Sequence, residues 1–64
     1  MPLYEVAILE ESKDEGGLET LVVGPVTVVA RDPYSAAVIT TEENAEAVRK
    51  VDRQRMEVLV RPFR

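Results

Sequence analysis

Apolar and polar side chains alternate along the first part of the chain. Residues 3–9 follow this period of two, with Tyr4, Val6 and Ile8 on one side. Such alternation, with β-branched and aromatic residues, is typical of a half-buried β-strand. The polar stretch 10–17 comes next and ends in two glycines. It predicts an exposed hairpin loop in which one of the glycines adopts a positive φ.

The next stretch, residues 18–30, is strongly apolar and contains the longest apolar run of the chain, at 21–30. We expect this run to form the central strand of a small sheet, or a pair of strands. Gly24 and Pro25 interrupt it. Because proline has no amide hydrogen to donate, the chain either bulges or turns sharply there. A bulge within one long returning strand is the favoured interpretation, and two short strands are the alternative.

A helix is predicted to begin after this run. Asp32 is a good N-cap, and Pro33 suits the first helical position. Thr40 and Glu43 have the spacing of a capping box, which leaves two alternatives: one helix over residues 33–50, or a helix that breaks and restarts near Thr40. One helical stripe combines several apolar and small side chains and is expected to face the sheet. Its members are Tyr34, Val38, Thr41, Ala45 and Val48.

The last strand is predicted at residues 56–60, after a polar connection at 51–55, and Pro62 ends it. The order of elements is therefore β-β-α-β. We expect a single small α+β domain over residues 1–64. Its three- or four-stranded, mainly antiparallel sheet carries one helix, either continuous or broken near Thr40, on one face.

The strand pattern predicts two apolar faces, although one short helix can cover only one of them. The face expected beneath the helix contains Tyr4, Val6, Ile8, Val26, Val28, Met56, Val58 and Val60. The opposite face combines Leu3, Ala7, Leu9, Val29 and Leu59 with Glu5, Thr27 and Glu57. An antiparallel sheet that lives alone has a polar outer face. The second apolar face thus indicates burial against another chain; scattered exposed apolar residues are the alternative.

The residues expected to bind a protein partner lie on this second face and at the end of the last strand. They are Leu3, Leu9, Val29, Leu59, Arg61 and Phe63. Phe63 follows a proline and can act as an anchor, either on its own domain or in a neighbour. Unpaired edge strands add further sites at which another chain could pair.

The amino-acid composition excludes several kinds of stabilising and catalytic site. A domain of 64 residues has marginal stability on its own, and small domains are usually stabilised by disulfides, a metal or association. The chain has no Cys and no His, which excludes disulfides, the ordinary zinc sites and nucleophiles activated by histidine. We expect no cofactor and no catalytic residue. The adjacent carboxylates fall in loops or polar helical turns, where pKa shifts are small; they are Glu10 and Glu11, Asp14 and Glu15, and Glu42 and Glu43.

Charge is divided unevenly along the chain, whose net charge is −4. Residues 1–48 hold ten acids against two bases, a net −8, and residues 49–64 hold six bases against two acids, a net +4. Two solvated surfaces of opposite sign explain this split most simply. A head-to-tail contact between copies, or with a larger partner, is the second interpretation. Nucleic-acid binding by the basic end is the third, but few aromatics are present for base stacking and the acidic remainder opposes phosphate.

The first ten residues, MPLYEVAILE, resemble the start of the small tautomerases related to 4-oxalocrotonate tautomerase, which are chains of this size. The resemblance implies that Pro2, exposed by removal of Met1, acts as the catalytic base while arginines bind a substrate carboxylate. That family has a long helix directly after its first strand. Residues 16–31 of this chain depart from that pattern, since they have a strand-like order with Gly-Gly and Gly-Pro pairs.

These observations favour a non-enzymatic structural or interaction module. We expect a homo-oligomer or a small subunit of a larger assembly, such as a virion capsid or tail accessory protein. The alternatives are a tautomerase-like enzyme that uses Pro2 and a nucleic-acid-associated accessory protein. No stretch approaches the roughly 20 apolar residues of a membrane span. We therefore expect no membrane association, and a location in the cytoplasm or in a soluble assembly such as a virion.

Overall fold

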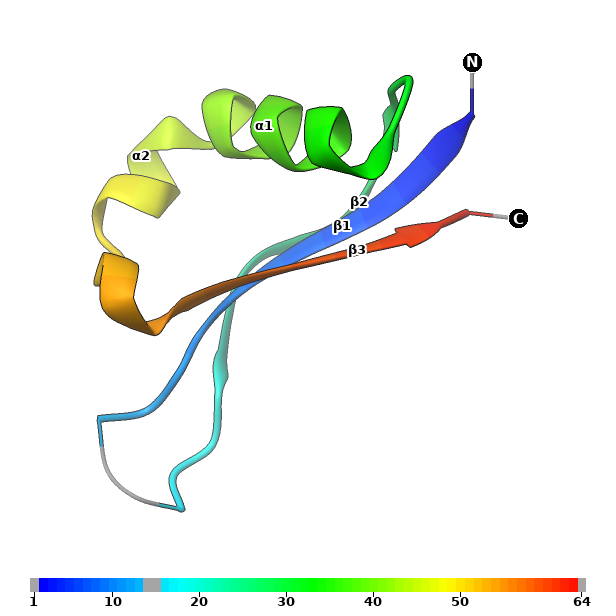
Figure 1. The fold of residues 1–64 in the computed structure, drawn as a ribbon. Coiled ribbons are helices and arrows are strands. Elements are labelled where there is room, and N and C mark those ends of the chain that lie inside the picture. The colour runs from blue at the N-terminus through cyan, green and yellow to red at the C-terminus, as the bar shows by residue number, and fades with distance from the viewer. Residues whose placement is uncertain (1, 14–15, 64) are drawn as a thin grey trace.

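The computed structural model describes residues 2–13 and 16–63, and it confirms the predicted β-β-α-β order of a small α+β domain. The elements are β1 (Leu3–Glu10), β2 (Thr20–Val29), α1 (Pro33–Glu43), α2 (Ala45–Arg49), the 3-10 turn η1 (Arg53–Arg55) and β3 (Met56–Pro62) (Figure 1). The Asp14 and Glu15 pair lies outside the described residues. Gly16, in the hairpin loop, has a φ of +80°, as expected of one of the two glycines.

The sheet has three antiparallel strands in the order β2-β1-β3. The first strand is therefore the central one, and the prediction that residues 21–30 form the centre of the sheet is wrong. Proline gives the physical reason. Pro25 lacks an amide hydrogen, and a strand that contains it is tolerated at an edge, where only one side of the strand must be hydrogen-bonded.

The favoured prediction at Gly24 and Pro25 is confirmed, because β2 is one continuous strand with a bulge. Val6 of β1 faces Val26 and Ile8 faces Val23, so Gly24 and Pro25 together lie opposite one residue. Gly24 has a φ of +95°, and a Cβ added there would lie 2.6 Å from the carbonyl oxygen of Val6. Only glycine fits this position without displacement of the backbone.

The bulge also decides which side chains of β2 face the core. Val23 and Val26 are an odd number of residues apart and would point to opposite faces of a regular strand. The extra residue reverses the alternation, so that both lie on the side of the sheet that α1 covers. A second irregularity, between Ile8 and Leu9, places Leu21 opposite Leu9 on the other face.

The core lies between the sheet and α1, on the face predicted to be covered. Val6, Ile8 and Ala36 are fully buried, and Thr40 is buried with them. The side chains that complete this core or are partly buried against it are Tyr4, Val23, Val26, Val28, Ala30, Ile39, Val58 and Val60. Seven of the eight strand residues predicted for the covered face, all except Met56, are thus buried in this core or packed against it.

The start of α1 is as predicted, but its end is not. Asp32 caps the helix, since its carboxylate accepts a hydrogen bond of 2.7 Å from the Ser35 amide, and Pro33 is the first helical residue. The break falls at Asn44, not near Thr40. The hydroxyl of Thr40 donates to the Ala36 carbonyl at 2.9 Å and so cannot cap a new helix. Asn44 instead ends α1, because its backbone and side-chain amides both donate to the Thr40 carbonyl.

The predicted helical stripe is rotated away from the true one. Tyr34 was expected to face the sheet, but it is 79% exposed. The buried side chains of α1 are Ala36 and Thr40, and Ile39 packs beside them. Ala36 and Thr40 are both small, so they fit between the helix and the valine-rich face of the sheet. The Thr40 hydroxyl can be buried there because the helix itself satisfies its hydrogen bond.

Candidate functional site

The face of the sheet opposite α1 carries a set of half-exposed apolar side chains, and we call it the open face. Figure 1 shows both helices on one side of the strands, with no element of the described chain across the other side. Five large apolar residues of this face are between 40% and 55% exposed: Leu3, Leu21, Val29, Leu59 and Phe63.

Strand register arranges the open face in rows that cross the three strands. The first row is apolar, with Val29, Leu3 and Phe63 side by side; the Phe63 amide donates to the Leu3 carbonyl at 3.0 Å. The second row is polar and consists of Thr27, Glu5 and Arg61. The third row is apolar again, with Pro25, Ala7 and Leu59, and the fourth has Leu21, Leu9 and Glu57.

An ion pair holds the second row together. Nε of Arg61 donates a hydrogen bond of 2.6 Å to Oε1 of Glu5, and Nη2 of Arg61 lies 2.5 Å from the same oxygen. The Arg61 side chain remains 77% exposed, whereas that of Glu5 is 23% exposed. Beside this pair is a shallow hollow of about 270 Å³, and it forms because Ala7 is small between Pro25 and Leu59. The open face therefore has a cation, an apolar hollow and apolar borders.

The six residues predicted to bind a partner all belong to this face or its border. They are Leu3, Leu9, Val29, Leu59, Arg61 and Phe63. Leu9 is the least exposed of the large apolar ones. Their role in binding stays a prediction. Leu21 and Pro25 belong to the same face but were missed. Both lie an even number of residues from Val29, so the alternation of β2 was a signal that could have found them.

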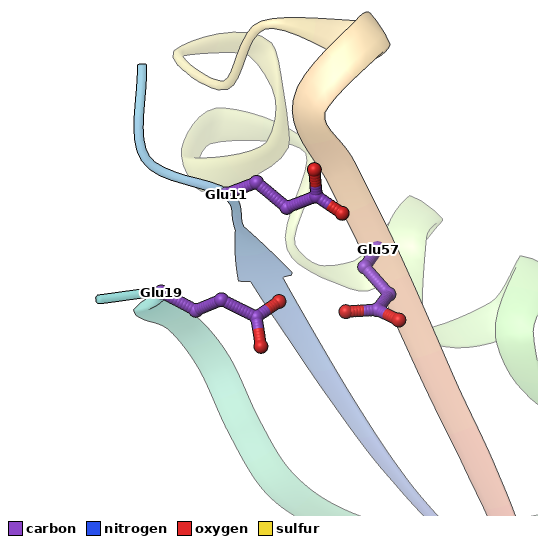
Figure 2. Close-up of side chains that lie close together, drawn as sticks. All are labelled: Glu11, Glu19 and Glu57. Carbon is purple, nitrogen blue, oxygen red and sulfur yellow. The ribbon is translucent and has the colours of Figure 1, made fainter. Parts of the chain in front are cut away.

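A cluster of three carboxylates lies at the far end of the open face. Glu11 directly follows β1, Glu19 directly precedes β2, and Glu57 belongs to β3 (Figure 2). One carboxylate oxygen from each lies within 4.8 Å of the others. We call this group the acidic trio. Sequence reasoning missed it because the hairpin joins the first two residues while only the β1–β3 register adds the third.

Crowding of like charges has a consequence for Glu19. A hydrogen bond to Glu57 and the charge of that carboxylate raise the pKa of Glu19 above its ordinary value, with a smaller contribution from Glu11. The three oxygens are of the type that Ca²⁺ or Mg²⁺ prefers. All three residues are at least partly exposed. A cationic side chain of another molecule could therefore also neutralise their negative charge.

The basic C-terminal segment does not form one continuous cationic surface in the described residues. Arg49 pairs with Glu46 at 2.7 Å. Arg55 is largely buried, and it reaches Glu10 at 3.1 Å and Asp52 at 3.6 Å. With Arg61 held by Glu5, three of the arginines in this segment lie against carboxylates. Each of these pairs offsets charge that a phosphate backbone would need.

The N-terminal proline lies beside the end of β2. Pro2 is exposed, and its carbonyl accepts a hydrogen bond of 3.2 Å from the Ala30 amide. The chain that follows β1 forms a hairpin and β2, where the tautomerases that it resembles at its start have a helix.

Among the described residues, no helix is both long enough and apolar enough to cross a bilayer. Comparison of the chain with protein-family models, with curated proteins and with solved structures finds no match.

Proposed function

We propose that this chain is a non-enzymatic interaction module that works as part of a protein assembly and binds through its open face. The observation that carries the proposal is the set of five large apolar side chains on the open face, each 40% to 55% exposed, opposite the helix. A virion accessory protein is one setting in which such a subunit would work.

Energetics support this proposal. Covering a half-exposed Leu or Val is worth about 1 kcal/mol. Five such side chains together are worth several kcal/mol. A domain of this size has a total stability of roughly 3–10 kcal/mol. Burial of the open face therefore contributes an amount comparable with the folding stability of the chain itself.

The remaining chemistry of the chain supports binding over catalysis. Histidine and cysteine are absent from the sequence, so an activated Ser or Cys nucleophile cannot be built from them. The carboxylates of the acidic trio lie at a partly exposed end of the sheet, without the deep pocket that perturbs a general acid or base most strongly.

Site-specific photo-crosslinking tests the proposal. A benzophenone amino acid replaces Leu59 at the centre of the open face, and the chain is irradiated in the cells that naturally produce it. We expect one discrete protein adduct, either to the chain itself or to another protein, identified by mass spectrometry. The matched control is the same replacement of Ala45, which is exposed on α2 away from the face.

The comparison of the two positions decides the outcome. An adduct at position 59 and none at position 45 supports the proposal. No protein adduct at position 59, or equal diffuse labelling at both positions, would overturn it.

A further inference from the structure

We propose that the open face binds a second copy of this chain through a two-fold axis that crosses the strands at the level of Ala7 and Leu59. This inference rests on the proposed function and names the partner. In this arrangement the two sheets stack face to face with their strands in opposite directions. Each copy then supplies the same surface, as a two-fold interface requires.

The charges of β3 on the open face become complementary when a second copy is rotated about this axis. Arg61 lies two residues from Leu59 toward one end of β3, and Glu57 lies two residues from Leu59 toward the other. The two charges are about 13 Å apart along one strand, too far to pair within a copy. Rotation about an axis at Leu59 places Arg61 of each copy over Glu57 of the other. Two equivalent ion pairs form together.

The opposite orientation of the second copy is unfavourable because it brings like charges together. If the strands of the two copies ran in the same direction, the acidic trio of one would face that of the other. Within one chain the three carboxylates already lie within 4.8 Å of one another, and a hydrogen bond to Glu57, with the charges of Glu57 and Glu11, raises the pKa of Glu19. A cation from the second copy relieves this repulsion, whereas three further carboxylates intensify it.

The apolar centre fits the same axis. Leu59 is 50% exposed and borders the hollow of about 270 Å³ that Ala7 and Pro25 line. In a two-fold pair about this axis, Leu59 of each copy meets Leu59 of the other, and the two hollows face each other beside them. The contact is small, because a three-stranded face of this length lies at the lower end of the range for specific interfaces. We therefore expect a dissociation constant in the micromolar range.

Charge reversal tests the axis directly. Arg61→Glu places a carboxylate against the trio of the second copy, and Glu57→Arg places an arginine against Arg61. Each variant alone should dimerise at least 100-fold more weakly than the natural chain by sedimentation velocity. An equimolar mixture of the two variants restores both ion pairs, since each copy then carries the charge that its partner needs. The mixture should sediment as a heterodimer.

The controls separate this inference from the function on which it rests. Glu42→Arg, on the exposed side of α1, should dimerise like the natural chain, and circular dichroism shows that each variant is folded. A natural chain that stays monomeric overturns the self-association, while a crosslink from position 59 to a different protein would leave the proposed function standing. Single variants that dimerise normally, or a mixture that fails to associate, overturn the two-fold axis.

Discussion

The two faces of the sheet are built from the same three strands, yet they have different physical roles. Beneath α1, Val6 and Ile8 are fully buried and the face is almost wholly apolar. The open face interrupts its apolar rows with an ion pair and ends in the acidic trio. The first pattern excludes water permanently. The second combines apolar and charged side chains, and in our proposal a partner covers it.

Truncation of one aliphatic side chain on each face gives the largest expected contrast. Ile8→Ala removes fully buried methyl groups and should lower the free energy of unfolding by about 2–5 kcal/mol. In a domain of marginal stability this is enough to unfold much of the protein. Leu59→Ala, on the open face, should cost less than about 1 kcal/mol in the monomer. Urea denaturation at low protein concentration measures both, and equal losses would contradict the division into two roles.

The bulge that lets β2 serve both faces is the next point to test. Gly24→Ala should lower the free energy of unfolding by about 1–3 kcal/mol, since the residue has a positive φ and the new Cβ meets the Val6 carbonyl oxygen. Gly16→Ala is the matched control, with a positive φ but no heavy atom within 4 Å of the added Cβ. Its cost should be about 1 kcal/mol, and thermal denaturation ranks the two. The reverse order would contradict the bulge geometry.

The ion pair of the open face should matter little for folding. Arg61→Ala removes a pair whose arginine is 77% exposed, so the free energy of unfolding of the monomer should change by less than about 1 kcal/mol. The same substitution should weaken self-association measurably, because the guanidinium faces the second copy in the proposed dimer. Chemical denaturation and sedimentation on one preparation separate the two effects. A large loss of monomer stability would assign Arg61 to folding instead.

The acidic trio gives the smallest expected effect, and its sign follows from the raised pKa of Glu19. Because this pKa is higher in the folded chain than its ordinary value of 4.5, the group favours folding at low pH. That contribution is lost as the pH rises through the raised pKa. Relative to the natural chain, Glu19→Gln should therefore become more stable as the pH rises.

Melting temperatures of the two proteins across the acidic range test this sign. Glu42→Gln, outside the trio, serves as the control and should leave the profile of the natural chain unchanged. A stabilising effect of Glu19→Gln that grows toward low pH would contradict the assignment.

The sequence pattern predicted the fold class and the two faces well because strand alternation has a strict period. Leu3, Val29 and Leu59 fall on the open face as the alternation requires. The order of strands could not be read in the same way. Nothing in the period of two indicates whether β3 pairs with β1 or β2, and the acidic trio depends on that choice.

The helix face was mispredicted for a different reason. Apolar and small residues occur all around α1, so several stripes are plausible from spacing alone. The choice among them depends on tertiary packing, which favours the small Ala36 against the valines of the sheet and leaves Tyr34 in solvent. The position of the break at Asn44 depends on which side chain bonds to the free carbonyl groups at the end of the helix. Thr40 satisfies its own hydroxyl inside the helix and is no longer a cap.

The central claim is that another molecule covers the open face when the protein works. The most direct test of this claim is the relaxation of methyl groups by a soluble nitroxide. It is measured on the chain at high concentration, or on the chain bound to its crosslinked partner. Leu18, 90% exposed, and Ile8, fully buried, serve as internal references. The account predicts that the Leu59 and Val29 methyls are protected nearly as well as those of Ile8. Relaxation of both as fast as that of Leu18 would contradict it.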